Sequence, residues 1–170
     1  MLISKSLNEA FNAQAGRELG ASNQYINIAG YFDVESLPEL AAFFYRQSDE
    51  ERMHAMKFVH YVSEAGGQVS IPAVPAPPGG ISTAEEAAKR ALDWEMEVTQ
   101  QINGLMDMAI KENDHIAQDF LRWFVTEQLE EVSSMDQLLS VIRRAGEDGI
   151  LMVEQYLARS GAPEAGPGGE

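Results

Sequence analysis

Apolar and polar residues recur along this chain with the period of an α-helix, and the pattern predicts four long helices followed by a short one. The first stripe spans about residues 6–33, and its members are spaced by three, four or seven positions. Similar stripes cover about residues 36–65, 83–111 and 114–143, and a shorter amphipathic segment covers 148–159. The first stripe consists of Leu7, Phe11, Gln14, Glu18, Tyr25, Ala29 and Phe32.

Local signals predict where these helices begin and end. In a capping box, a serine or threonine and a glutamate three residues later bond to each other's backbone amides. Gly66 and Gly67 follow the second stripe and can supply a left-handed cap, and Asp114 opens the fourth. Capping-box sequences stand at three of the predicted helix starts: Ser6 with Glu9, Ser36 with Glu39, and Thr83 with Glu86.

The connection between the second and third stripes, residues 68–82, is rich in proline and glycine and is not expected to be helical. Fifteen extended residues can span ~50 Å, whereas a helix of about 28 residues is ~42 Å long. The segment can therefore run the length of a bundle and leave the second and third helices parallel. We expect an all-α four-helix bundle with one long crossover between helices 2 and 3, plus a short C-terminal fifth helix.

Composition narrows the class of protein. The chain has 27 acidic and 12 basic residues, a net charge of −15 and no cysteine. Such a charge argues against a nucleic-acid partner, and the absence of cysteine excludes disulfides and thiolate metal sites. No apolar stretch is long enough to span a membrane, and no signal peptide is visible, so we expect a cytoplasmic protein. Residues 1–160 are predicted to form one domain and residues 161–170 a disordered tail.

Polar side chains interrupt the middle of every apolar stripe. At one level of a bundle they would bring four carboxylates together without a buried lysine or arginine. Each buried ion costs several kcal/mol, and like charges raise that cost. Either the carboxylates are protonated or cations lie among them, and two divalent cations would balance four carboxylates. Oxygen ligands with one imidazole suit iron or manganese, with zinc as a competitor. The residues are Glu18, Glu51, His54, Glu95, Gln128 and Glu131.

Di-iron bundles carry a glutamate on each of two helices and Glu-x-x-His on each of the other two. The first motif is intact here as Glu51-Arg52-Met53-His54, while the second is altered to Gln128-Leu129-Glu130-Glu131. Together with "YFDVESLPELAAFFYRQSDEERMHAM" and "LRWFVTEQLEEV", these motifs resemble those of the ferritins, and of bacterial non-haem ferritins in particular. The resemblance covers about residues 4–158. It implies a ferroxidase that oxidises Fe(II) with O2 and stores the Fe(III) mineral inside a hollow 24-subunit shell of identical chains.

The same resemblance implies roles for single residues. One iron site would use Glu18, Glu51 and His54, and a second would share Glu51 as a bridge with Glu95 and Glu131. Gln128 would lie beside the ligands, and Tyr25 matches a tyrosine next to the di-iron centre, although a plain core aromatic is an equal alternative. A third iron site would map to Glu50, Glu127, Glu130 and Glu131, with Glu130 facing further away on the helix. A solvated acidic face is the alternative for this third group.

Other members of the ferritin-like class remain as alternatives. In haem-containing bacterioferritin the haem-ligating methionine directly follows the glutamate of Glu-x-x-His, where this chain has Arg52, so no haem is expected. A di-iron oxidase or peroxidase of the rubrerythrin kind usually has a cysteine-rich iron domain. A DNA-protecting mini-ferritin would lack the fifth helix. A bundle without metal would leave the buried carboxylates unexplained.

Overall fold

A computed structural model describes residues 2–160, and helices account for all the regular structure within that range. The four long helices are α1 (Lys5–Val34), α2 (Pro38–Glu64), α3 (Ala84–Lys111) and α4 (His115–Ala145). A single 3-10 turn, η1 (Glu147–Gly149), leads into the short helix α5 (Ile150–Ser160). The expected all-α architecture is confirmed, and the predicted tail at 161–170 lies outside the described residues.

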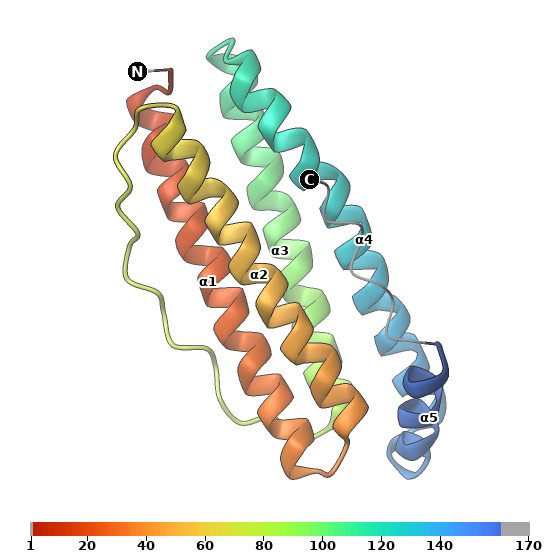
Figure 1. Cartoon of the computed structure of the whole chain (residues 1–170). Helices are drawn as coiled ribbons and strands as arrows, with labels where there is room; N and C mark the ends of the chain where they lie inside the picture. The colour runs from red at the N-terminus through yellow and green to blue at the C-terminus, as the bar shows by residue number, and fades with distance from the viewer. Residues whose placement is uncertain (1, 161–170) are drawn as a thin grey trace.

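The helices form two antiparallel pairs, α1 with α2 and α3 with α4, joined chiefly by contacts between α1 and α3. The crossover leaves α2 at one end of the bundle and runs beside α1 to the other end, so α2 and α3 point the same way (Figure 1). Helix α5 contacts α2 and α4 at the end of the bundle. This arrangement is the predicted bundle with one long crossover.

Side chains of α1 hold the start of the crossover. The Asn8 side chain accepts a hydrogen bond from the Gln68 backbone N–H at 2.9 Å and donates one to the Gln68 carbonyl at 3.1 Å. Asn12 accepts from the Ser70 backbone N–H at 2.6 Å. One turn further on, a Cβ on Gly16 would lie 2.8 Å from Pro72 Cγ, so the close approach of the crossover requires glycine there.

The helix ends follow some of the predicted caps and depart from others. Thr83 accepts from the Glu86 backbone N–H, as expected. Asp114, at the predicted start of the fourth helix, accepts from the Ala117 backbone N–H. Helix α1, however, is capped by Ser4, whose hydroxyl accepts from the Leu7 backbone N–H at 3.1 Å. The predicted cap Ser6 is wrong, because the helix begins one residue before it.

The predicted cap of α2 is also wrong. Ser36 has a positive φ of 60° and lies in the turn, while Leu37 occupies the cap position without a side-chain hydrogen bond. The free backbone amides of Glu39 and Leu40 instead donate to the carboxylate of Glu154 on α5, at 2.9 and 2.8 Å. A carboxylate is favourable there because a helix N-terminus carries partial positive charge.

Two apolar clusters fill the bundle, one at each end. The first contains Phe32, Phe44 and the buried α5 residues Val153 and Leu157, and the second contains Phe11, Phe58 and Phe124. The polar residues of the four stripes fall between these clusters along every helix. The fold therefore places one polar layer at mid-height between two apolar ones.

One residue of the apolar stripe that helical spacing predicts for α4 is wrong; that stripe is Leu121, Val125, Gln128, Val132, Met135 and Leu139. Val125 is 42% exposed, and the neighbouring Phe124 is the buried residue at 1%. Phe124 stacks on Phe58 with ring centroids 4.4 Å apart, which turns Val125 outward.

Among the described residues no helix is both long and apolar enough to cross a membrane.

Candidate metal centre

Six polar side chains from four helices meet in the polar layer, each with 5% or less of its surface exposed. Helix α1 contributes one, α2 two, α3 one and α4 two. All six were predicted from the interrupted stripes. They are Glu18, Glu51, His54, Glu95, Gln128 and Glu131.

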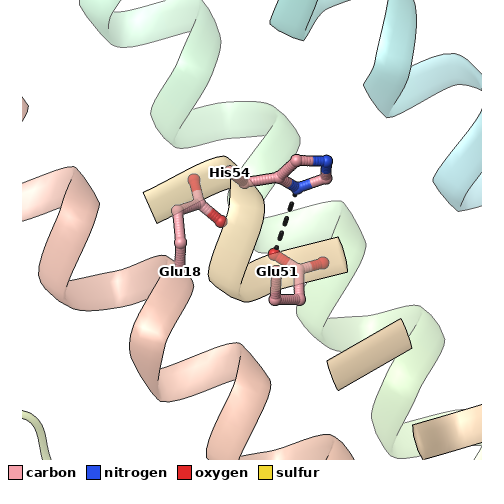
Figure 2. Close-up of side chains that lie close together, drawn as sticks. All are labelled: Glu18, Glu51 and His54. Carbon is pink, nitrogen blue, oxygen red and sulfur yellow. Dashed lines mark hydrogen bonds and ion pairs between the residues drawn. The ribbon is translucent and has the colours of Figure 1, made fainter. Parts of the chain in front are cut away.

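Glu18, Glu51 and His54 form one tight group, in which one ligand atom from each lies within 4.8 Å of the others. His54 Nδ1 lies 3.3 Å from Glu51 Oε2, one turn earlier on α2. Glu18 projects from α1 toward this pair (Figure 2). Three donors on two helices thus surround a space of the size that a metal ion needs.

Glu95 on α3 interacts with Glu51 of this group and is also held by two further neighbours. The Tyr25 hydroxyl donates a short hydrogen bond to Glu95 Oε1. Gln128 Nε2 lies 3.3 Å from Glu95 Oε2 and 3.1 Å from the Thr99 hydroxyl oxygen. Tyr25 is therefore part of the polar layer, and its hydroxyl is already engaged by a predicted ligand.

A second group of possible ligand atoms consists of His54, Glu127 and Glu131, again within 4.8 Å. His54 Nε2 lies 4.0 Å from Glu127 Oε1, and the Glu127 side chain is 20% exposed. The charge of Glu127 also helps to raise the pKa of Glu50. The Glu50 carboxylate accepts a hydrogen bond from the Gln47 side chain. Glu130, the other residue predicted for a third site, is exposed and joins neither group.

Burial dominates the electrostatics of the centre. It raises the pKa of Glu18 to about 7, and it raises the pKa of Glu51 and Glu131 well above the ordinary value, with Glu95 as the next contributor in both. The pKa of Glu95 is raised by burial as well. Without cations, these carboxyls therefore keep their protons to higher pH than exposed glutamates do.

The histidine shifts in the opposite direction, because burial penalises its charged form. The pKa of His54 is lowered to about 4, so its imidazole is neutral near pH 7. A neutral imidazole has a lone pair free for a metal. Trp123 and Phe124 pack against the imidazole in T-shaped arrangements, with ring centroids 5.3 and 5.9 Å away.

The donor set defines the chemistry that the centre can support. Carboxylate oxygens with one imidazole suit iron, manganese or zinc, and no thiolate is available because the chain has no cysteine. Cations that enter would displace the protons of the buried carboxyls. Two divalent cations replacing four protons would leave the charge of the layer unchanged.

Sequence reasoning missed one residue of this layer. Gln14 is fully buried and donates through Nε2 to Glu18 Oε1 at 2.8 Å. The sequence pattern placed Gln14 in the first stripe, but only as a residue on the core-facing side of the helix. Its position one turn before Glu18 is the signal that could have identified it, because residues four apart on a helix are neighbours.

Comparisons with known proteins agree on one family. A family profile described as "Ferritin-like domain" matches residues 8–145. A bacterioferritin of Mycobacterium tuberculosis is 40% identical over 163 residues, covering 91% of this chain and 90% of the relative. A bacterial non-heme ferritin of Staphylococcus aureus is 36% identical over 147 residues, with 86% and 89% covered. An open-pore ferritin of Archaeoglobus fulgidus superposes with a TM-score of 0.89 at 35% identity, with 92% and 97% covered.

Proposed function

The chain belongs to the ferritin family, and from this premise we propose that it stores iron, oxidising Fe(II) with O2 at the buried polar layer. The observation that carries the proposal is the convergence of four carboxyls with raised pKa and one neutral histidine in a single layer. No lysine or arginine is buried among the described residues. Divalent cations are the substrates that this layer is suited to receive.

We assign the first Fe(II) to Glu18, Glu51 and His54, which already lie within reach of one ion. The second would lie between Glu51, Glu95 and Glu131, so that Glu51 bridges the two. Expected ligand distances are ~2.0–2.2 Å. Gln128 and Tyr25 donate to Glu95, and a cation that binds Glu95 must compete with those hydrogen bonds.

The chemistry follows from hard oxygen ligands, which favour Fe(III) over Fe(II). Two Fe(II) ions held together can each give one electron to the same O2 molecule, which with two protons becomes hydrogen peroxide, so that superoxide is not released. The Fe(III) then leaves for the mineral, inside a shell that we expect to contain 24 copies of this chain. His54 and the carboxyls supply the ligands, and the enclosing aromatic rings keep bulk water away from the imidazole.

Substitution of Glu51 tests this assignment. Glu51→Ala removes the bridge to both ions and should slow Fe(II) oxidation more than loss of any other single ligand. Glu51→Gln keeps the size of the side chain and should be slow as well, because a neutral amide is a poor bridge. Stopped-flow absorbance after mixing with Fe(II) and O2 measures the rate. The matched control is Glu39→Ala, because Glu39 is an exposed glutamate on the same helix. A structure of the parent protein soaked with Fe(II) that shows no metal at Glu18, Glu51 and His54 would contradict the proposal.

A third cation site is proposed beside the first two, at Glu127 and Glu131 with Glu50 as the outer member. These carboxyls repel one another without a cation, and the pKa of Glu50 is raised to about 7 by burial and by Glu127. Glu130 is the weakest member of the predicted set, because its side chain is exposed.

Glu127→Ala should leave the oxidation of two irons largely intact while changing the Fe:O2 stoichiometry and the rate at which iron reaches the mineral. Oxygen electrode measurements and iron-transfer kinetics provide the test. Glu130→Ala is the comparison and should change both quantities less. Parent-like stoichiometry and transfer in Glu127→Ala would identify these glutamates as plain surface charge.

A further inference from the structure

The two oxygens of the Glu18 carboxyl have different surroundings. Oε1 accepts a hydrogen bond from Gln14 Nε2 at 2.8 Å. Oε2 is buried and has no hydrogen-bond partner among the described residues. Oε2 is therefore the oxygen that no fixed donor holds, and the contact of Glu18 with the Glu51 carboxyl depends on a shared proton that a cation would replace.

The orientation of the Gln14 amide is itself fixed. Arg17 Nη1 lies 3.2 Å from Gln14 Oε1, and a guanidinium can only donate hydrogen bonds. The amide oxygen must therefore face Arg17, which leaves the NH2 group facing Glu18. The second hydrogen of that NH2 group is directed to Gln101 Oε1 at 3.2 Å.

We propose that Gln14, oriented by Arg17, is a positioning residue that holds Glu18 so that it binds the first cation through Oε2 alone. This inference rests on the proposed function, since it takes Glu18 as a ligand. Gln14 is fully buried, so water cannot replace its amide as a donor. Hydrogen bonds that orient a ligand commonly contribute ~10–100-fold to metal affinity.

The test uses Zn²⁺ and Co²⁺, which bind such sites without being oxidised by O2 under these conditions. Gln14→Leu removes the donor while filling a similar volume. Zn²⁺ titration calorimetry should show a ~10–100-fold loss of affinity at the site that contains Glu18, with the second site little changed. The visible spectrum of Co²⁺ at the first site should also change, because a released carboxylate can bind through both oxygens and alter the coordination number.

The matched control is Gln24→Leu. Gln24 is also a buried glutamine on α1 (1% exposed), and its Oε1 has no hydrogen-bond partner among the described residues. The Gln24→Leu variant should retain the Zn²⁺ affinity and the Co²⁺ spectrum of the parent protein. Equal losses in Gln14→Leu and Gln24→Leu would overturn the positioning role, since any buried glutamine would then produce them.

Arg17→Met, at an exposed position on α1, supplies a second variant. Charge alone predicts that removing a cation beside the centre strengthens Zn²⁺ binding, whereas loss of the amide's orientation predicts weaker binding. Weaker binding supports the proposal, and tighter or unchanged binding overturns the role of Arg17. A parent protein that binds no Zn²⁺ at Glu18 would contradict the proposed function itself, while parent-like binding in Gln14→Leu contradicts only the positioning of Glu18.

Discussion

At the scale of single residues, Glu18 shows how the buried layer depends on pH. Burial raises its pKa from an ordinary 4.5 to about 7. The unfolded chain loses this proton near pH 4.5 and the folded chain only near pH 7, so the free energy of unfolding falls as pH rises through this window. In metal-free protein, Glu18→Gln should therefore reduce the loss of stability between about pH 5 and pH 8 by on the order of 2 kcal/mol. Thermal unfolding of chelator-treated protein at the two pH values measures this difference.

The control for this prediction is Glu9→Gln, an exposed glutamate on the same helix, which should follow the parent at both pH values. His54 has the opposite sign: its pKa is lowered to about 4, so its contribution to stability is lost as pH falls below about 6.5. Adding Zn²⁺ near pH 8 should stabilise the parent more than Glu18→Gln. A Glu18→Gln protein with the pH dependence of the parent would show that Glu18 does not keep its proton in the folded state.

At the scale of elements, the docking of α5 depends on the buried carboxylate of Glu154. It accepts the backbone hydrogen bonds of Glu39 and Leu40 at the start of α2, where no cap residue serves them. Glu154→Ala leaves the buried amide of Leu40 and the partly buried amide of Glu39 without a partner, and the buried one alone costs ~1–3 kcal/mol. We expect the free energy of unfolding to fall by about 2 kcal/mol or more, measured by denaturant unfolding of the metal-free chain.

Glu154→Gln should cost less, because an amide oxygen can still accept one of the two bonds. Gln155→Ala, exposed on the same helix, should stay within about 0.5 kcal/mol of the parent. Protease cleavage between α4 and α5 should become faster in Glu154→Ala alone. Unchanged stability in that variant would mean that Val153 and Leu157, buried in the core, suffice to dock α5.

At the scale of the whole molecule, α5 also presents apolar side chains that the single chain does not cover. Leu151 is 65% exposed and Met152 is 71% exposed. We propose that copies of this chain cover them in a 24-subunit shell, so the native particle should have about 24 times the subunit mass of 18.7 kDa. Leu151→Ser with Met152→Ser should weaken assembly, seen by light scattering, while leaving the helical content of the bundle unchanged.

Deleting the chain from Asp148 onward is a less selective test, because it removes Glu154 as well as the apolar surface. The deletion should weaken assembly and also reduce the stability of α2, whereas the double serine variant should weaken assembly only. A parent protein that stays a monomer or dimer at micromolar concentration across ordinary salt would contradict the shell. An intact shell in the double serine variant would show that Leu151 and Met152 are not at a contact between copies.

The sequence determined the features that depend on residues close together in the chain. Helical periodicity located all five helices, and residues 68–82 were long enough to allow the parallel arrangement of α2 and α3. The layer of Glu18, Glu51, Glu95 and Gln128 was also visible, because each interrupts an apolar stripe near mid-helix. These signals act over three or four residues, where helical geometry alone fixes which side chains are neighbours.

Only the tertiary structure decided features that depend on distant partners. Glu154 caps α2 across 114 and 115 residues of sequence, so the local Ser36–Glu39 signal was misleading. Phe124 rather than Val125 faces the core because Phe58 on α2 stacks on it. The hydrogen bonds of Gln14 acquire a meaning only once Glu18 lies beside ligands from α2. A one-dimensional pattern gives the face of each helix, but the partner of a buried polar group is set by how the helices pack.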